Sequence, residues 1–135
     1  MKPALLLIAA AFTTSASPQT SGDALIGDWR GDSICVVRDS ACRDEKALYH
    51  IKKVGSPSDR LTLRADKIVN GEPVNMGTID CIYAAERKTL TCEFAKGVIH
   101  LTLRDTYLDG TMNLTDGTLW RNISLKRDGG KLLNR

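Results

Sequence analysis

The chain has 135 residues, with nineteen basic and sixteen acidic side chains and a formal net charge of +3. The two signs of charge are interleaved and no run of five like charges occurs, which argues against a nucleic acid or a membrane surface as partner. The length is that of one domain.

The first sixteen residues have the pattern of a secretory signal peptide. Met1-Lys2 gives a short basic start, an apolar run extends from Ala4 to Phe12, and small residues follow up to Ala16. The apolar run is too short to span a bilayer, so no membrane span is expected. The alternative is a buried N-terminal helix. We predict a signal peptide over 1–16, cleavage after Ala16, and export to the periplasm or the exterior.

The segment 17–24 is polar and predicts a flexible leader. Cleavage removes Lys2, which leaves eighteen basic and sixteen acidic residues. A barrel domain is expected over 25–127 and a C-terminal tail over 128–135.

From Leu25 onward, apolar residues alternate with polar ones, as expected of half-buried strands. The first strands are predicted over 26–37, 47–54 and 60–68. Asn70-Gly71 is a strong hairpin signal between the third strand and the next, 74–85. Simple pairing around that turn sets Leu63 opposite Thr78, which alternates onto the other face of the sheet. A one-residue bulge at Gly77 would restore Ile79 to the inside.

The second half keeps one apolar face through successive turns, over strands 88–95, 97–104, 107–115 and 118–127. A one-residue slip at any turn would move a whole apolar set to solvent. Asp116-Gly117 is a two-residue hairpin signal. The predicted cross-strand neighbours are Tyr83 with Leu90, Cys81 with Cys92, Ile79 with Phe94, Phe94 with Ile99, Cys92 with Leu101, Leu90 with Leu103, Leu103 with Leu108, Leu114 with Leu119, and Met112 with Arg121.

Eight short antiparallel strands in sequence predict an all-β, closed up-and-down barrel, which leaves no sheet edge unpaired. A barrel of this size is either filled by side chains or holds one small ligand. The predicted interior is rich in Leu and Ile, which favours a filled core. A cavity above about 300 Å³ would instead support ligand binding.

Four cysteines lie in the mature part, and an even count in an exported chain predicts two disulfides. The competing interpretation is a metal site, but there is no Cys-x-x-Cys and only two histidines are available. The register favours Cys81–Cys92, which leaves Cys35–Cys42 to close the loop between the first two strands. No metal and no cofactor are expected.

Gly27-Asp28-Trp29, at the start of the first strand, resembles the Gly-x-Trp motif of the lipocalin-like, or calycin, group. The resemblance covers architecture over 25–127. It implies a basic residue late in the last strand that packs across the Trp, and Arg121 stands on the inward face there. A guanidinium over an indole contributes about 0.5 to 2 kcal/mol. The chain departs from the group in being shorter, lacking a C-terminal helix and having a different cysteine pattern.

Two non-enzymatic functions are compatible with these features, and we expect a monomer in both. The first is binding of a small, mainly apolar ligand inside the barrel. The residues expected to line it are Trp29, Tyr49, Tyr83, Phe94, Met112 and Arg121.

The second is a protein-interaction or inhibitor module that acts through the charged loop 38–45 with a filled barrel. A loop constrained by Cys35–Cys42 loses less entropy on docking. The charged side chains of this loop are Arg38, Asp39, Arg43, Asp44 and Glu45. A loop that only connects two strands is the simpler interpretation.

No catalytic residues are predicted. His50 and His100 alternate onto the outward face, and spacing places no Ser or Cys nucleophile beside either one. The strand carboxylates Asp28, Asp32, Asp66, Asp80 and Glu93 also mostly alternate outward. A cluster of one histidine with two carboxylates in a single pocket would be the signal for an enzyme.

Overall fold

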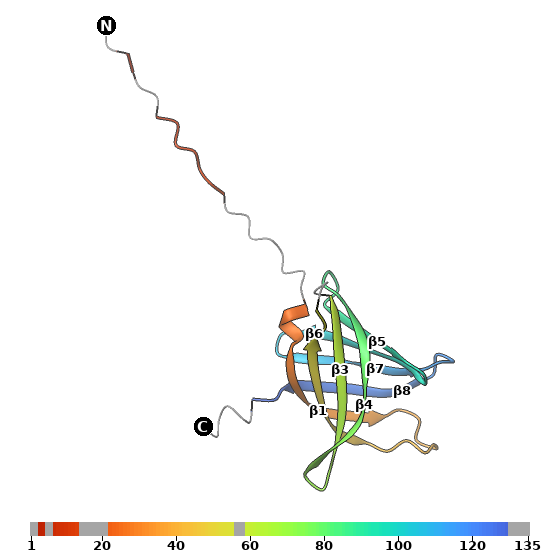
Figure 1. Ribbon diagram of the computed structural model, residues 1–135. Coiled ribbons are helices and arrows are strands. Elements are labelled where there is room, and N and C mark those ends of the chain that lie inside the picture. Colours follow the sequence, from red (N-terminus) through yellow and green to blue (C-terminus); the bar gives the residue numbers. More distant parts are fainter. Residues whose placement is uncertain (1–2, 5–6, 14–21, 56–58, 130–135) are drawn as a thin grey trace.

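The computed structural model describes residues 3–4, 7–13, 22–55 and 59–129, and its strands form one closed barrel in the order β1 to β8 (Figure 1). All neighbouring strands are antiparallel. This confirms the predicted fold. A short 3-10 helix, η1, precedes the barrel over Gly22–Leu25. The strands are β1 Gly27–Cys35, β2 Glu45–Lys53, β3 Arg60–Val69, β4 Glu72–Ala84, β5 Thr89–Phe94, β6 Gly97–Arg104, β7 Tyr107–Leu114 and β8 Leu119–Arg127.

Parts of the predicted signal peptide lie outside the described residues, and so do most of the predicted leader and most of the predicted tail. The predicted cleavage point after Ala16 also lies outside them. Within the part of the chain that the structure describes, no helix is long and apolar enough to cross a membrane.

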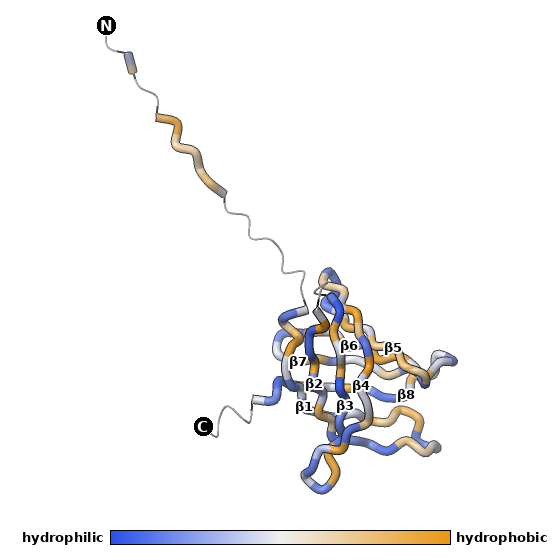
Figure 2. Tube along the Cα trace, viewed as in Figure 1, coloured by the Kyte–Doolittle hydropathy of each residue, from blue (hydrophilic) through white to orange (hydrophobic). Residues whose placement is uncertain are grey.

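Alternating hydropathy along the strands puts one face of every strand into the core (Figure 2). Leu63, Leu90, Leu101 and Leu108 are fully buried. The core cluster also contains both members of the Cys81–Cys92 pair. Among the predicted inward residues, Leu119 is an exception, because 37% of its surface is exposed.

Most of the predicted pairings are confirmed, including Tyr83 with Leu90, Cys81 with Cys92 and Leu103 with Leu108. The β5–β6 register is a correction: Cys92 faces Ile99 and Leu90 faces Leu101, two residues away from the prediction. The turn is tighter than expected, because Phe94 pairs directly with Gly97. A shift of two residues leaves every side chain on its own face, so the core is unaffected.

The two Gly-containing hairpins behave differently. Asn70 and Gly71 both have positive φ, 52° and 81°, as a two-residue turn of the mirror-image type requires. In the hairpin between β7 and β8, the Leu114 N–H donates to Thr118 O, so the turn is longer than the two residues Asp116-Gly117. The register then shifts so that Met112 faces Arg121 but Asn113 faces Leu119. The predicted Leu114–Leu119 pairing is therefore wrong, and Trp120 is the extra residue of a bulge.

The bulge predicted at Gly77 is confirmed. Leu63 pairs with Ile79 and Ala65 with Gly77, but Asp66 pairs with Asn75, so Met76 is the extra residue. Gly77 has a φ of 131°, a conformation that residues with a side chain rarely adopt. The Asn75 side chain accepts a hydrogen bond from the Gly77 N–H and fixes the bend.

Both predicted disulfides are present, Cys35–Cys42 and Cys81–Cys92. They indicate an oxidising environment.

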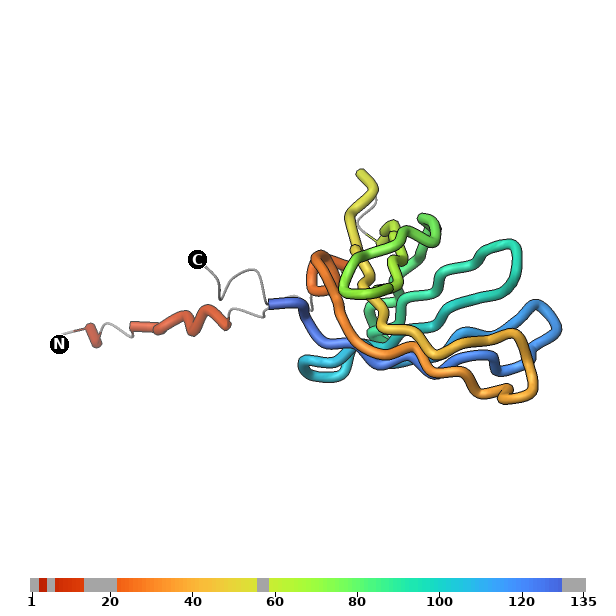
Figure 3. Tube along the Cα trace, turned by 90° about the horizontal axis from the view of Figure 1, so that it is seen from below, coloured from red at the N-terminus to blue at the C-terminus, as the bar shows by residue number. Residues whose placement is uncertain are grey.

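Cys81–Cys92 is also the last β4–β5 pair toward the β3–β4 turn. From there the two strands diverge: the tip of the β3–β4 hairpin points down in Figure 1 and those of β5–β6 and β7–β8 point to the right, and Figure 3 shows the same separation from below.

Candidate functional site

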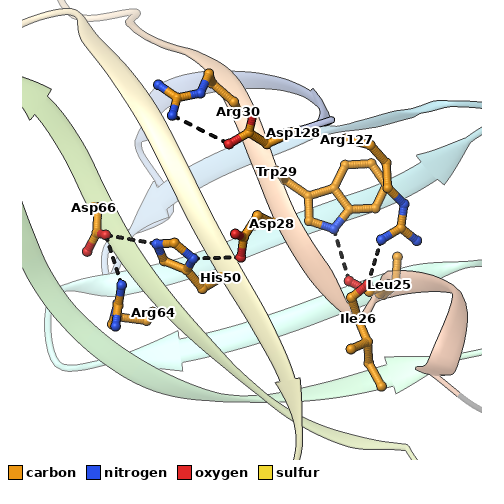
Figure 4. A network of polar contacts seen from close by, with 10 residues as sticks. All are labelled: Leu25, Ile26, Asp28, Trp29, Arg30, His50, Arg64, Asp66, Arg127 and Asp128. Atoms are coloured by element: carbon orange, nitrogen blue, oxygen red, sulfur yellow. Dashed lines mark hydrogen bonds and ion pairs between the residues drawn. The ribbon is translucent and has the colours of Figure 1, made fainter. Parts of the chain in front are cut away.

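The two ends of the barrel are built differently. At one end, η1 and the two chain ends of the barrel meet; we call this the closed end. The Trp29 indole donates a hydrogen bond to Leu25 O at 2.9 Å, and both residues are fully buried. Arg127 lies over the ring, 4.4 Å from its centroid, and donates to the carbonyl of Ile26 (Figure 4). It also donates to the carbonyl of Ala24.

The basic residue that packs across Trp29 is therefore Arg127, and the prediction of Arg121 is wrong. Both arginines point to the same face of β8, but pairing with β1 places Arg127 beside Trp29 and Arg121 beside Cys35. Six residues of an extended strand separate the two positions, about 20 Å along β8.

The other end, which we call the open end, contains a cavity of about 570 Å³. It is lined by residues toward the ends of β1, β5 and β7, by residues of the first half of β2, β6 and β8, and by residues from the middle of β3 and β4. The size lies within the usual range for small-molecule sites, about 300 to 1,000 Å³. The apolar lining residues are Tyr49, Ala65, Met76, Ile79, Phe94, Ala95, Ile99, Met112, Leu114 and Trp120.

The structure brings four of the six predicted ligand-lining residues together in this cavity: Tyr49, Phe94, Met112 and Arg121. Trp29 is part of the closed end. Tyr83 lies one residue before the end of β4, also at the closed end, and does not line the cavity. The alternation of a strand identifies the inward face, but it does not tell which half of the barrel a residue occupies.

The cavity extends to the seam where β4 and β5 separate. Met76 to Ile79 line one side and Phe94 to Lys96 the other. The predicted pairing of Ile79 with Phe94 does not occur, since strand pairing stops at Cys81 and Cys92. Continuing the ladder would set Asp80 opposite Glu93, and like charges directly opposite each other destabilise a sheet.

Sequence analysis missed Trp120 and Met76 as lining residues. In a regular strand Trp120 alternates outward, and only the bulge in β8 turns the chain so that it reaches the cavity. Met76 enters in the same way, as the extra residue of the β4 bulge. The Gly77 bulge was predictable, but its effect on the neighbouring side chain was not.

Polar groups gather on one wall of the cavity. The Arg121 guanidinium donates to Ser33 O at 3.2 Å, to Ser33 Oγ at 3.4 Å and to Glu45 Oε1 at 3.3 Å. Arg121 is 8% exposed. Glu45 was predicted only as part of the charged loop, but it lies in β2 and lines the cavity.

The rest of the charged loop is held by internal contacts as well as by the disulfide. Asp44 Oδ1 accepts a hydrogen bond from the Cys35 N–H at 2.8 Å, and Ser40 Oγ donates to Val37 O at 2.6 Å. The Arg43 guanidinium donates to the carbonyls of Ser40 and Cys42. The structure assigns no partner within the described residues to Arg38 or Asp39, so their charges face solvent.

His50 differs from the predicted surface histidine. Its ring lies between two carboxylates on the outer face, with Nδ1 2.7 Å from Asp28 Oδ1 and Nε2 2.9 Å from Asp66 Oδ2 (Figure 4). Asp66 also contacts Arg64 at 3.3 Å, and its side chain is only 3% exposed. The arrangement that would signal an enzyme, one histidine with two carboxylates in a single pocket, is met in part: the three side chains are in contact, but only Asp28 and His50 line the neighbouring surface pocket of about 430 Å³, and Asp66 does not. The three side chains also connect β1, β2 and β3.

The described residues contain no group of three or more His, Cys, Asp or Glu side chains arranged to hold a metal ion.

The closed antiparallel barrel of eight strands is compatible with a lipocalin-like architecture. Comparison with protein-family models gives no match, and comparison with curated proteins gives none either.

Proposed function

We propose that this protein is an exported, lipocalin-like binding protein that takes a small, mainly apolar ligand into the open end of its barrel and catalyses no reaction. The observation that carries the proposal is the cavity of about 570 Å³. Its apolar lining comes from β2 to β8 and leaves one polar wall, the composition typical of small-molecule sites.

The distribution of exposed apolar residues supports the same end of the barrel. Six of the nine large apolar side chains of the barrel that are at least 37% exposed lie toward the open end, in or next to β1, β3, β4 and β8, and the other three are Val54, Ile82 and Tyr107. The six are Ile34, Val36, Val69, Val74, Met76 and Leu119. An apolar rim around an apolar cavity favours entry of a ligand of the same character.

The experiment is a fluorescence titration of the purified protein with N-phenyl-1-naphthylamine, a neutral apolar probe. We expect saturable binding of one probe per chain. Ala65→Phe places a ring inside the cavity and should weaken binding, and circular dichroism checks that the variant is folded. Asn122→Leu adds an apolar side chain at an exposed position of β8 and should bind as the parent does. Absence of saturable binding, or equal binding by Ala65→Phe, would contradict the proposal.

A second candidate function is docking of a protein partner on the charged loop 38–45. Its support is the fixed conformation of the loop, which lowers the entropy cost of docking. Native mass spectrometry of the protein from its own source separates the two functions. A retained small-molecule mass supports the barrel, whereas a bound protein that Arg38→Glu releases supports the loop.

A further inference from the structure

One hydroxyl in the lining of the cavity makes no hydrogen bond within the described residues. Tyr49, in β2, is 2% exposed and lines the cavity. Within the described residues, no hydrogen bond is made by its hydroxyl. The hydroxyl is not among the fully buried atoms that lack a partner, so it keeps contact with the cavity and is available to a ligand there.

The neighbouring charges at the polar wall are already matched. Arg121 donates to Glu45 Oε1 and to both oxygens of Ser33, so its positive charge faces a carboxylate inside the wall. The Glu45 side chain is 19% exposed and that of Arg121 is 10% exposed. Separating an ion pair that is this deeply buried is unfavourable, because it leaves a charge without a partner.

The proton of the Tyr49 hydroxyl is firmly held. Burial raises the pKa of Tyr49 to about 12, the negative charge of Glu45 adds to this, and Arg121 opposes it. At neutral pH the group is therefore an uncharged hydroxyl with a proton to donate.

We propose that the Tyr49 hydroxyl binds the polar head of the ligand, and that this head is an uncharged oxygen acceptor, such as the hydroxyl of a long-chain alcohol or the carbonyl of an ester. The inference rests on the proposed function and names its ligand class. The apolar tail lies against Phe94, Met112 and the other lining residues, and the head lies at the polar wall.

Beside the Tyr49 hydroxyl, a carboxylate head is disfavoured by Glu45; Lys96, the other cation of the lining, is exposed at the seam between β4 and β5. The carboxylate would compete with Glu45 for Arg121, or else sit beside a second negative charge in a partly desolvated site. Removing the charge of Glu45 frees Arg121 to form a paired contact with a carboxylate, which is the geometry that arginine favours. Glu45 is thus the residue that sets selectivity between neutral and anionic amphiphiles.

The test is displacement of bound N-phenyl-1-naphthylamine by dodecanol, by methyl dodecanoate and by dodecanoate. For the parent protein, the two neutral compounds should compete at least about tenfold better than the anion. Tyr49→Phe should weaken dodecanol about fivefold relative to N-phenyl-1-naphthylamine, the value of one hydrogen bond. Glu45→Gln should improve dodecanoate about tenfold or more relative to dodecanol.

Each outcome has a definite meaning. If the probe binds but dodecanoate is preferred by the parent, or if Glu45→Gln leaves the preference unchanged, the head-group inference is wrong and the proposed function stands. If the probe does not bind to the folded parent protein at all, both proposals fail. Glu45→Gln keeps the test informative if Tyr49→Phe does not fold.

Discussion

Arg127 lies over the indole of Trp29, 4.4 Å from the ring centroid, and so joins the last strand of the barrel to the first. The same guanidinium donates to two carbonyls at the end of η1 and the residue after it, Ala24 and Ile26. One side chain thereby closes the end of the barrel opposite the cavity.

Arg127→Ala should lower the free energy of unfolding by about 2 to 3 kcal/mol, because it removes a cation–π contact and two hydrogen bonds. Lys126→Ala, at the neighbouring position, removes an exposed contact with Tyr107 and should change the free energy of unfolding by less than about 0.5 kcal/mol. Urea denaturation measures both. Equal stabilities of the two variants would show that the guanidinium does not hold the closed end.

His50→Ala should destabilise the protein by about 2 to 4 kcal/mol, because Asp66 is left buried with only Arg64 as a donor. The control is His100→Ala, since His100 is exposed and makes one side-chain contact, with Thr91. That change should cost less than about 0.5 kcal/mol. The same loss in both would mean that the His50 contacts do not stabilise the fold.

Gly110 lies where β7 approaches β6 closely. A Cβ at this position would lie 1.7 Å from the backbone oxygen of His100, which cannot move without breaking the ladder. Gly110→Ala should therefore destabilise the barrel by about 3 kcal/mol or prevent folding. Gly129→Ala, with open space around the residue, should have no effect on the thermal midpoint. A fully stable Gly110→Ala protein would contradict the close approach.

The stability of the protein should fall at alkaline pH because of Tyr49. Its pKa is about 12 in the folded chain, compared with 10.0 ordinarily, so the unfolded chain releases the proton first. The free energy of unfolding therefore decreases between about pH 10 and pH 12, by at most about 3 kcal/mol. Below pH 10 this contribution is constant.

The difference between the parent and Tyr49→Phe isolates this effect from other groups that titrate in the same range, including Tyr83, whose pKa burial also raises. Urea titrations at a series of pH values from 8 to 12 give the two curves. Parallel curves would show that the Tyr49 hydroxyl ionises as it does in water.

The Cys81–Cys92 disulfide should limit how far the seam between β4 and β5 opens. Replacing both cysteines by Ala should cost about 3 kcal/mol and speed amide exchange at the adjoining pairs, Ile82 with Thr91 and Tyr83 with Leu90. Removing Cys35–Cys42 should instead affect exchange in the loop between β1 and β2. Unchanged exchange in β4 and β5 without Cys81–Cys92 would refute this role.

Much of the candidate site was predictable because alternation defines which side chains face inward. Tyr49, Phe94, Met112 and Arg121 were recognised in this way. Trp29 and Tyr83 were grouped with them, because the alternation is the same at both ends of a strand. Trp120 was missed, because a bulge reverses the face of one residue without any Gly or Pro to mark it.

The sequence by itself determined the eight strands, their inward faces and both disulfides, since each depends on local alternation and on turns between neighbouring segments. Only the tertiary structure decided which arginine meets Trp29, where β4 leaves β5, and that His50 joins two carboxylates. Those contacts depend on closure of β1 against β8, on the bulges and on the position of each residue along the barrel. A period of two residues carries no information about any of these.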